Sequence, residues 1–249
     1  MRRIAALLVV LAVLVAGCGG GSGPQKRTLT VLAASSLTGT FTDLATKYEA
    51  EHPGVHVRLV FDSSATLAQM AVERAPGDVL ATADRRTMDD AAAGKGVRGT
   101  PAQFATNVLV LAVPAGNPKH IGAFADLDRP GVDYLACVTT APCGAAAKAL
   151  LQQGGIGRAP ASEEVDVKAV LAKVAAGDAD AGLVYRSDVT AAKGQVTAVD
   201  VPGAAASPNT YWVAVTANAK QRTLARAWVD LLTGATGRAV LQSAGFGTG

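Results

Sequence analysis

Two short serine-rich segments hold the residues of this sequence that could bind a ligand. The segment Ala34–Leu37 follows one apolar run, and the segment Asp62–Leu67 follows the next. Each leads directly into a helical pattern, so serine hydroxyls lie beside the unpaired N–H groups of a first helical turn, which binds an anion without lysine or arginine. A single turn of this kind is explained more simply by helix capping, which stabilises a helix by about 1 kcal/mol. Two matched turns at consecutive strand ends favour an oxyanion site.

Nucleophilic catalysis is the alternative chemistry for serines at strand ends. A serine hydrolase needs a base and a third, orienting group beside its nucleophile. The histidines His52, His56 and His120 stand in no recognisable catalytic setting, and the sequence has no G-x-S-x-G segment. Pro53-Gly54 prevents the helix that would align His52 and His56 on a metal. We therefore expect surface histidines, no metal-cation site, no cofactor and no catalytic residues.

The periodicity around these residues predicts alternating strands and helices. In the first part of the chain we expect strand 28–33, helix 39–51, strand 55–61, helix 66–74, strand 79–81 and helix 85–93. A strongly apolar strand at 107–113 is followed by strand 134–138, helices 144–153 and 166–176, strands 181–184, 196–201 and 211–215, and helices 221–232 and 237–244. This alternation predicts mainly parallel sheets, whose ligands bind outside the carboxyl ends of the strands.

The same pattern predicts an α/β protein with two lobes. Residues 27–107 are expected to form the first part of lobe 1, and residues 108–208 are expected to form lobe 2. Residues 209–249 contain a late strand followed by helices, which is typical of a chain that returns to its first lobe.

The first residues predict export and a lipid anchor. Arg2 and Arg3 precede an apolar stretch of about twelve residues, which is shorter than the ~20 residues of a membrane-spanning helix. Residues 14–18 (Leu-Val-Ala-Gly-Cys) resemble a bacterial lipobox, so residues 1–17 are expected to be a lipoprotein signal peptide and Cys18 the lipidated residue. An ordinary signal peptide cut elsewhere is the alternative. Residues 18–26 predict a flexible tether.

Charge, aromatic content and cysteines narrow the possible partners. The formal charge of +3 includes two signal arginines, and the rest of the chain has 21 basic against 20 acidic residues. With 4% aromatic residues and no basic cluster, no nucleic-acid groove is expected. Five aromatic residues are expected in the core or at the contact between lobes and not as ligands: Tyr48, Tyr134, Tyr211, Trp212 and Trp228. Cys137 and Cys143 have five residues between them, which in an exported chain favours a disulfide over two free thiols.

Four segments together resemble the periplasmic molybdate-binding proteins that serve ABC importers. In the order of that family they are Val31–Leu37, Ser63–Gln69, Ala75–Val79 with Ala83-Asp84, and Gly182–Asp188. Each segment alone is a weak match, but the ordered set covers nearly the whole mature chain. The resemblance implies a periplasmic-binding-protein type II fold, in which a hinge joins two lobes and an oxyanion is enclosed between them.

The resemblance also implies which residues bind the anion. Hydroxyl ligands fall on Ser36 and Ser64 in lobe 1 and on Tyr185 in lobe 2, and backbone N–H ligands at two helix starts fall on Cys143 and Val167. The implied ligand is molybdate, with tungstate as a close competitor. The implied partners are the permease and ATPase subunits of an ABC importer. The receptor itself is expected to be a monomer at the outer face of the cell membrane.

Neutral donors would select an anion by its charge state. Burying the proton of hydrogen phosphate without an acceptor costs about 1–3 kcal/mol, whereas molybdate, tungstate and sulfate carry no proton near neutral pH. A receptor of the same fold for sulfate or phosphate is the alternative function. Asp62, where many family members have a small or neutral residue, would accept the phosphate proton if it faced the ligand. Strand alternation predicts instead that Asp62 points away or caps the next helix.

Overall fold

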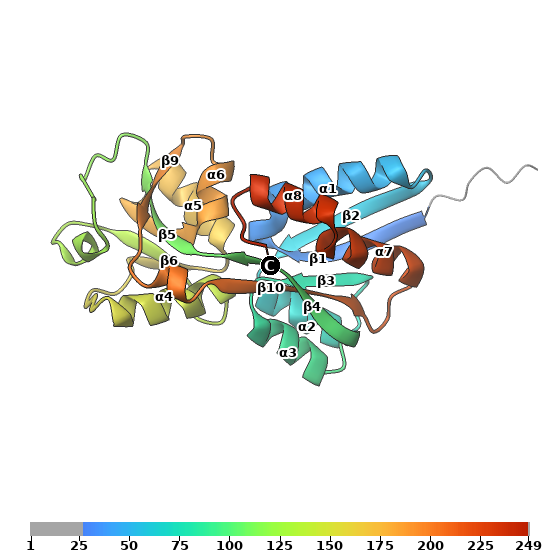
Figure 1. The fold of residues 1–249 in the computed structure, drawn as a ribbon. Coiled ribbons are helices and arrows are strands. Elements are labelled where there is room, and N and C mark those ends of the chain that lie inside the picture. Colours follow the sequence, from blue (N-terminus) through green and yellow to red (C-terminus); the bar gives the residue numbers. More distant parts are fainter. Residues whose placement is uncertain (1–26, 249) are drawn as a thin grey trace, which may run out of the picture.

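Two α/β lobes make up the part of the chain that the computed structural model describes, residues 27–248 (Figure 1). The sheet of lobe 1 has the strand order β2-β1-β3-β10-β4, and the sheet of lobe 2 has the order β7-β6-β8-β5-β9. The chain passes between the lobes at Val108 and again through residues 201–208. The predicted signal peptide, the lipidation of Cys18 and the tether lie outside the described residues. Within residues 27–248 no helix is long and apolar enough to cross a membrane.

Lobe 1 is built around a strand that is buried on both faces. Its strands are β1 (Arg27–Ala34), β2 (Val55–Asp62), β3 (Val79–Thr82), β4 (Val97–Asn107) and β10 (Asn209–Thr216). One face carries helices α1 (Thr38–Glu51), α7 (Arg222–Thr233) and α8 (Ala235–Ser243), and the other carries α2 (Ser64–Val72) and α3 (Arg85–Ala93). Because side chains alternate along a strand, Val31 of β1 packs in the first layer and Leu32 in the second.

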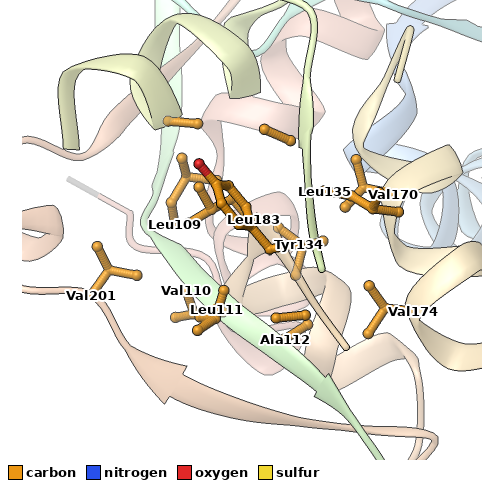
Figure 2. Packing of buried hydrophobic residues seen from close by; sticks show 14 of the residues in the cluster. Leu109, Val110, Leu111, Ala112, Tyr134, Leu135, Val170, Val174, Leu183 and Val201 are labelled. Carbon is orange, nitrogen blue, oxygen red and sulfur yellow. The ribbon is translucent and has the colours of Figure 1, made fainter. Parts of the chain in front are cut away.

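Lobe 2 has a single continuous core. Its strands are β5 (Leu109–Pro114), β6 (Tyr134–Cys137), β7 (Ser162–Glu164), β8 (Ala181–Tyr185) and β9 (Val196–Asp200), and its helices are α4 (Pro142–Gln153), α5 (Val167–Ala176) and α6 (Arg186–Ala191). Leu111, Leu183 and Val170 pack in this core together with Tyr134 (Figure 2). Gly182 lets α5 approach β8 closely, because a Cβ atom there would lie 2.6 Å from Val170 Cγ1.

Each sheet is mixed, whereas the sequence pattern predicts mainly parallel sheets. In lobe 1, β1 pairs parallel with β2 and β3, but β10 pairs antiparallel with β3 and β4. In lobe 2, β6 pairs parallel with β7 and β8, but β5 pairs antiparallel with β8 and β9. The chain enters β5 and β10 directly from the other lobe. These strands therefore lack the crossover helix that joins parallel neighbours.

The pattern also misses three elements, β4, β7 and α6. The first seven residues of β4 are exposed or half-buried, so this edge strand shows no apolar alternation in its sequence. Strand β7 has three residues and α6 has six, which is too short for a periodic signal. Three short 3-10 helices complete the fold: η1 (Ser35–Leu37), η2 (Phe124–Asp128) and η3 (Ala204–Ala206).

Candidate functional site

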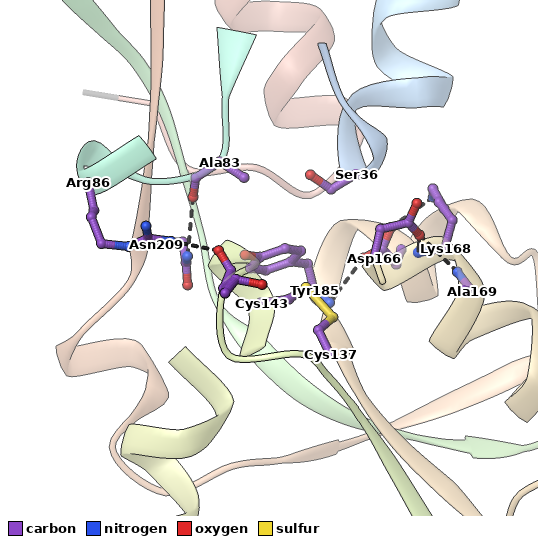
Figure 3. Close-up of a disulfide and its surroundings, with 12 residues drawn as sticks. Ser36, Ala83, Arg86, Cys137, Cys143, Asp166, Lys168, Ala169, Tyr185 and Asn209 are labelled. Carbon is purple, nitrogen blue, oxygen red and sulfur yellow. Dashed lines mark hydrogen bonds and ion pairs between the residues drawn. A yellow bond between two sulfur atoms is a disulfide. The ribbon is translucent and has the colours of Figure 1, made fainter. Parts of the chain in front are cut away.

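Residues from both lobes line a small cavity between the lobes. Its wall includes all five residues that the sequence predicts as ligands: Ser36, Ser64, Cys143, Val167 and Tyr185. Each of the five is at most 6% exposed. The space open to the centre of a water-sized sphere is about 10 Å³, roughly what one water molecule needs. In Figure 3, Ser36 on the lobe 1 side faces Tyr185 and the Cys137–Cys143 disulfide on the lobe 2 side. The cavity therefore suits a small ligand held between the lobes.

The serine hydroxyls on the lobe 1 wall do not cap helices. Helix α2 begins after Ser63 and η1 begins after Ala34, in both cases without a side-chain capping hydrogen bond. Ser64 Oγ instead accepts the backbone N–H of Ala83 at 2.9 Å. Because this bond uses a lone pair of the oxygen, the hydroxyl proton of Ser64 is left to donate into the cavity. Helix capping therefore does not account for these serines.

Ser36 is held by a tyrosine from a distant part of the chain. Its Oγ lies 2.9 Å from the hydroxyl oxygen of Tyr211, which stands on β10 and is fully buried. Burial raises the pKa of Tyr211 far above its ordinary value, although the hydrogen bond with Ser36 acts in the opposite direction. Tyr211 therefore stays protonated, and when it donates to Ser36, the serine proton points elsewhere. The sequence predicts Tyr211 in the core or at the contact between lobes, which is confirmed, but it does not predict the contact with Ser36.

Tyr185 brings the lobe 2 hydroxyl to the cavity. It is the last residue of β8, it is 1% exposed, and its hydroxyl oxygen has no hydrogen-bond partner within the described residues. Burial is the main cause of a pKa well above the ordinary tyrosine value, and Tyr211 and Asp84 raise it further. The group is therefore a neutral donor. An unpaired buried hydroxyl costs about 1–3 kcal/mol, so a ligand that accepted its proton would relieve this cost.

Two helix N-termini form the rest of the lobe 2 wall. Val167 is the first residue of α5, and the capping residue Asp166 accepts the N–H groups of Lys168 and Ala169 at 2.8 and 3.0 Å. This cap does not use the N–H of Val167. Pro142, the first residue of α4, has no N–H, so Cys143 carries the first N–H of that helix. Helix N-termini carry partial positive charge, which makes both positions suited to an anion.

A disulfide fixes the start of α4. The structure joins Cys143 to Cys137 at the end of β6, with their Cα atoms 5.8 Å apart. Gly144 follows in the helix, and a Cβ atom there would lie 2.0 Å from the carbonyl oxygen of Val138. The loop therefore lies directly against the first turn of α4.

A buried ion pair behind the cavity connects the donors of lobe 2. Asp188, which is fully buried, accepts the backbone N–H of Tyr185 at 3.0 Å and contacts Lys168 Nζ at 2.7 Å. Burial raises the pKa of Asp188, and Lys168 opposes the rise. The pair links the end of β8 to the first turn of α5. An acidic residue three positions after a helix-capping position is the sequence signal that could have identified Asp188.

The cavity wall contains no lysine or arginine among the described residues. Its single charged side chain is Asp166, whose carboxylate already accepts two helix N–H groups. Asp62 does not line the cavity, and its Oδ1 accepts the N–H of Ser63 at 2.6 Å. An anion here would therefore be bound by neutral donors and helix termini.

The histidines of the hydrolase alternative lie away from the cavity. None of His52, His56 and His120 is part of its wall. His52 Nδ1 lies 2.8 Å from the carbonyl oxygen of Tyr48, and His56 pairs with Glu49. No histidine is placed to activate Ser36 or Ser64.

The sequence is similar to known transport receptors over almost its whole length. Residues 29–247 match the family described as bacterial extracellular solute-binding protein. The chain is 42% identical to the molybdate-binding protein ModA of Mycobacterium tuberculosis, over 96% of this chain and 95% of that protein. It is 30% identical to the molybdate-binding protein ModA of Escherichia coli, over 91% of each.

Solved structures share the two-lobe arrangement. The periplasmic molybdate-binding protein of Azotobacter vinelandii superposes with a TM-score of 0.77 at 21% identity, over 88% of this chain and 98% of that chain. The sulfate-binding protein SubI from Mycobacterium tuberculosis also gives 0.77, at 18% identity, over 88% of this chain and 86% of that chain. These structures support a periplasmic-binding-protein type II fold. The chain belongs to the bacterial extracellular solute-binding proteins, which are transport receptors and not enzymes, and within them to the family of ModA.

Proposed function

We propose that this protein captures molybdate between its lobes, with tungstate as a close competitor, and delivers it to the permease and ATPase subunits of an ABC importer. It acts outside the cell membrane as a monomer, anchored through lipid on Cys18. The observation that carries the proposal is the donor set of the cavity between the lobes: hydroxyls of lobe 1 face helix N-termini of lobe 2 and the Tyr185 hydroxyl, which has no partner within the described residues. The relatives with 42% and 30% identity carry the name of molybdate-binding proteins.

The donor set supports a fully deprotonated anion. Ser64 and Tyr185 have protons free for a ligand, and the N–H groups of Cys143 and Val167 stand at helix starts. Charge-assisted hydrogen bonds to such an anion are about twice as strong as neutral ones. Hydrogen phosphate would bury its proton against donors, at a cost of about 1–3 kcal/mol. The charge state of the anion is thus the first level of selection.

Sulfate is the second candidate ligand, because the sulfate-binding protein SubI has the same fold with the same TM-score as the molybdate-binding protein of Azotobacter vinelandii. Sulfate is also a proton-free tetrahedral dianion, so charge state does not separate it from molybdate. Selection between them must come from the size of the cavity. The sequence relatives favour molybdate.

Binding couples to closure of the lobes. Ser36 and Ser64 reach the cavity from lobe 1, and Cys143, Val167 and Tyr185 reach it from lobe 2. An anion that contacts both sets stabilises the closed arrangement more than the open one, and this shifts the population towards the closed form. The importer can then distinguish the liganded receptor from the unliganded one by its closed conformation.

Isothermal titration of the purified protein with molybdate, tungstate, sulfate and phosphate tests the ligand. One-to-one binding of molybdate and tungstate, with sulfate at least a hundredfold weaker, supports the proposal. Binding of sulfate or phosphate alone would replace the ligand and keep the receptor. Absence of any anion binding would overturn the proposed function. Mass spectrometry of the membrane-bound protein and of Cys18→Ser tests the lipid anchor.

A further inference from the structure

We propose that Arg86 is a latch residue that holds the two lobes closed over the bound anion. Its guanidinium, on helix α3 of lobe 1, donates to the carbonyl oxygen of Thr140 in lobe 2 at 2.7 Å. This inference rests on the proposed binding function, because a latch matters only to a protein that closes on a ligand. It adds a residue outside the cavity to those that determine affinity.

Bonds of this kind between the lobes are rare in the structure. Among residues 27–248, side-chain hydrogen bonds join the lobes at two places, from Arg86 to Thr140 and from Asn107 to Ser187. Asn107 directly precedes the passage between the lobes at Val108, so its bond belongs to the hinge. The Arg86 bond joins two segments that lie 54 positions apart in the sequence. It is therefore the contact expected to break when the lobes separate.

The donor is positioned by its own lobe. One guanidinium nitrogen of Arg86 lies 3.2 Å from Asp90, one turn along α3, and another lies 3.7 Å from the capping residue Asp84. The arginine side chain remains half exposed. These two carboxylates limit the freedom of the side chain before the lobes meet. Less conformational entropy is then lost when the bond to Thr140 forms.

The acceptor belongs to the part of lobe 2 that binds the anion. Thr140 stands in the short loop that the Cys137–Cys143 disulfide closes, and Cys143 carries the N–H at the start of α4. Gly144 packs against the backbone of the same loop. A hydrogen bond that fixes the Thr140 carbonyl therefore also restrains the position of the N-terminus of α4. The latch and the anion site act on one rigid unit.

The effect of a latch is expected in the dissociation rate. The hydrogen bond forms only after the lobes have closed, so it stabilises the liganded closed state and leaves the first encounter unchanged. Because this bond is exposed to solvent, it contributes less than a buried charged one and like an ordinary protein hydrogen bond, which corresponds to about a five- to tenfold change in an equilibrium constant. Most affinity differences between variants of one binding site appear in this rate.

Arg86→Ala and the matched control Arg85→Ala test the latch. Arg85 is the neighbouring residue on α3 and has the same charge. It pairs with Asp89 at 2.7 Å and lies 4.3 Å from the Trp212 ring, both in lobe 1, and within residues 27–248 it has no hydrogen bond to lobe 2. Stopped-flow measurements with molybdate should show that Arg86→Ala raises the dissociation rate about five- to tenfold, with association within twofold of wild type. Arg85→Ala should keep both rates within twofold. Equal melting temperatures of the unliganded variants would show that folding is intact.

Two outcomes separate failure of the latch from failure of the proposed function. If wild-type protein binds molybdate and both variants release it at the wild-type rate, the latch is wrong and the function stands. If wild-type protein binds no anion, the proposed function fails, and small-angle scattering of the unliganded proteins decides the latch. A larger radius of gyration for Arg86→Ala than for Arg85→Ala would support the latch, and equal radii would overturn it.

Discussion

The two lobes contribute different kinds of donor to the same cavity. Lobe 1 supplies serine side chains, Ser36 and Ser64, each held by a bond within its own lobe. Lobe 2 supplies mainly backbone, through the N–H groups of Cys143 and Val167, together with the hydroxyl of Tyr185. One substitution removes a side-chain donor, whereas a backbone N–H remains after any substitution except proline. Substitutions should therefore affect the two lobes very differently.

Removal of a lobe 1 hydroxyl should have the largest effect. We expect Ser64→Ala to weaken molybdate binding about 10- to 100-fold, because a hydrogen bond to a charged group contributes about 1.5–3 kcal/mol. The same substitution leaves the N–H of Ala83 unpaired, so thermal unfolding should also shift to lower temperature. Titration calorimetry measures the first effect. Thr66→Ala removes an exposed hydroxyl from the same helix and should bind like wild type.

Tyr185→Phe should separate affinity from stability. The Tyr185 hydroxyl has no partner within the described residues, so its loss should weaken molybdate binding about tenfold without lowering the melting temperature of the unliganded protein. Removal of a buried unpaired polar group can even raise that temperature. The pair of measurements is calorimetry with ligand and thermal unfolding without it. A lower melting temperature with unchanged affinity would mean that the hydroxyl serves the fold and not the ligand.

Two substitutions at one position should isolate a backbone donor. Val167 is the first residue of α5, where proline is well tolerated, and the extended backbone of Asp166 suits a residue before proline. Val167→Pro removes the N–H and should weaken binding about five- to tenfold. Val167→Ala keeps the N–H and should bind within about threefold of wild type. Circular dichroism controls for loss of α5. Equal affinities of the two variants would exclude this N–H as a ligand.

The same difference between lobes explains what the sequence could predict. The serine-rich turns of lobe 1 stand out by residue type at strand ends, so elementary capping chemistry points to them, and the resemblance to a family then selects Ser36 and Ser64. Cys143 and Val167 would bind the anion through backbone N–H groups, which every residue except proline has. Their residue types therefore give no signal, and only the resemblance to a family points to them. The contact between Tyr211 and Ser36 could not be predicted, because the two residues are 175 positions apart and a local sequence pattern holds no information about such a contact. Burial and strand pairing bring such residues together.

The two-lobe α/β fold predicted from the sequence is confirmed, and the errors in its details have similar causes. The sequence predicts the bounds of helices α1 and α3 to within one residue, because their buried side chains recur every three or four positions. Strand β4 was missed because it is an exposed edge, and the antiparallel direction of β5 and β10 follows from the passages between lobes. Periodicity reports which side of an element is buried. It carries no information about the direction in which a strand enters its sheet.

The disulfide should matter more for stability than for affinity. It closes a short loop, so its removal in Cys137→Ser/Cys143→Ser should lower the free energy of unfolding by about 2 kcal/mol. The N–H of residue 143 persists in the variant, and molybdate binding should weaken only about threefold. Chemical denaturation and calorimetry measure the two effects. A loss of molybdate affinity above tenfold would show that the disulfide is needed to hold the backbone donors of lobe 2 in position.

The smallest effect is expected from pH. Burial raises the pKa of both Tyr185 and Tyr211 above the ordinary tyrosine value near 10, so their neutral forms persist to higher pH than in an exposed tyrosine. Loss of a proton would remove a donor and place a negative charge beside the anion, and the raised pKa values move this loss further into alkali. Molybdate affinity should therefore stay constant within about twofold from pH 6 to pH 9. A tenfold loss at pH 9 in wild type that Tyr185→Phe abolished would show that the phenol titrates there. The Tyr185 hydroxyl of lobe 2 would then be sensitive to pH, whereas the serine hydroxyls of lobe 1 would not, because serine does not titrate in this range.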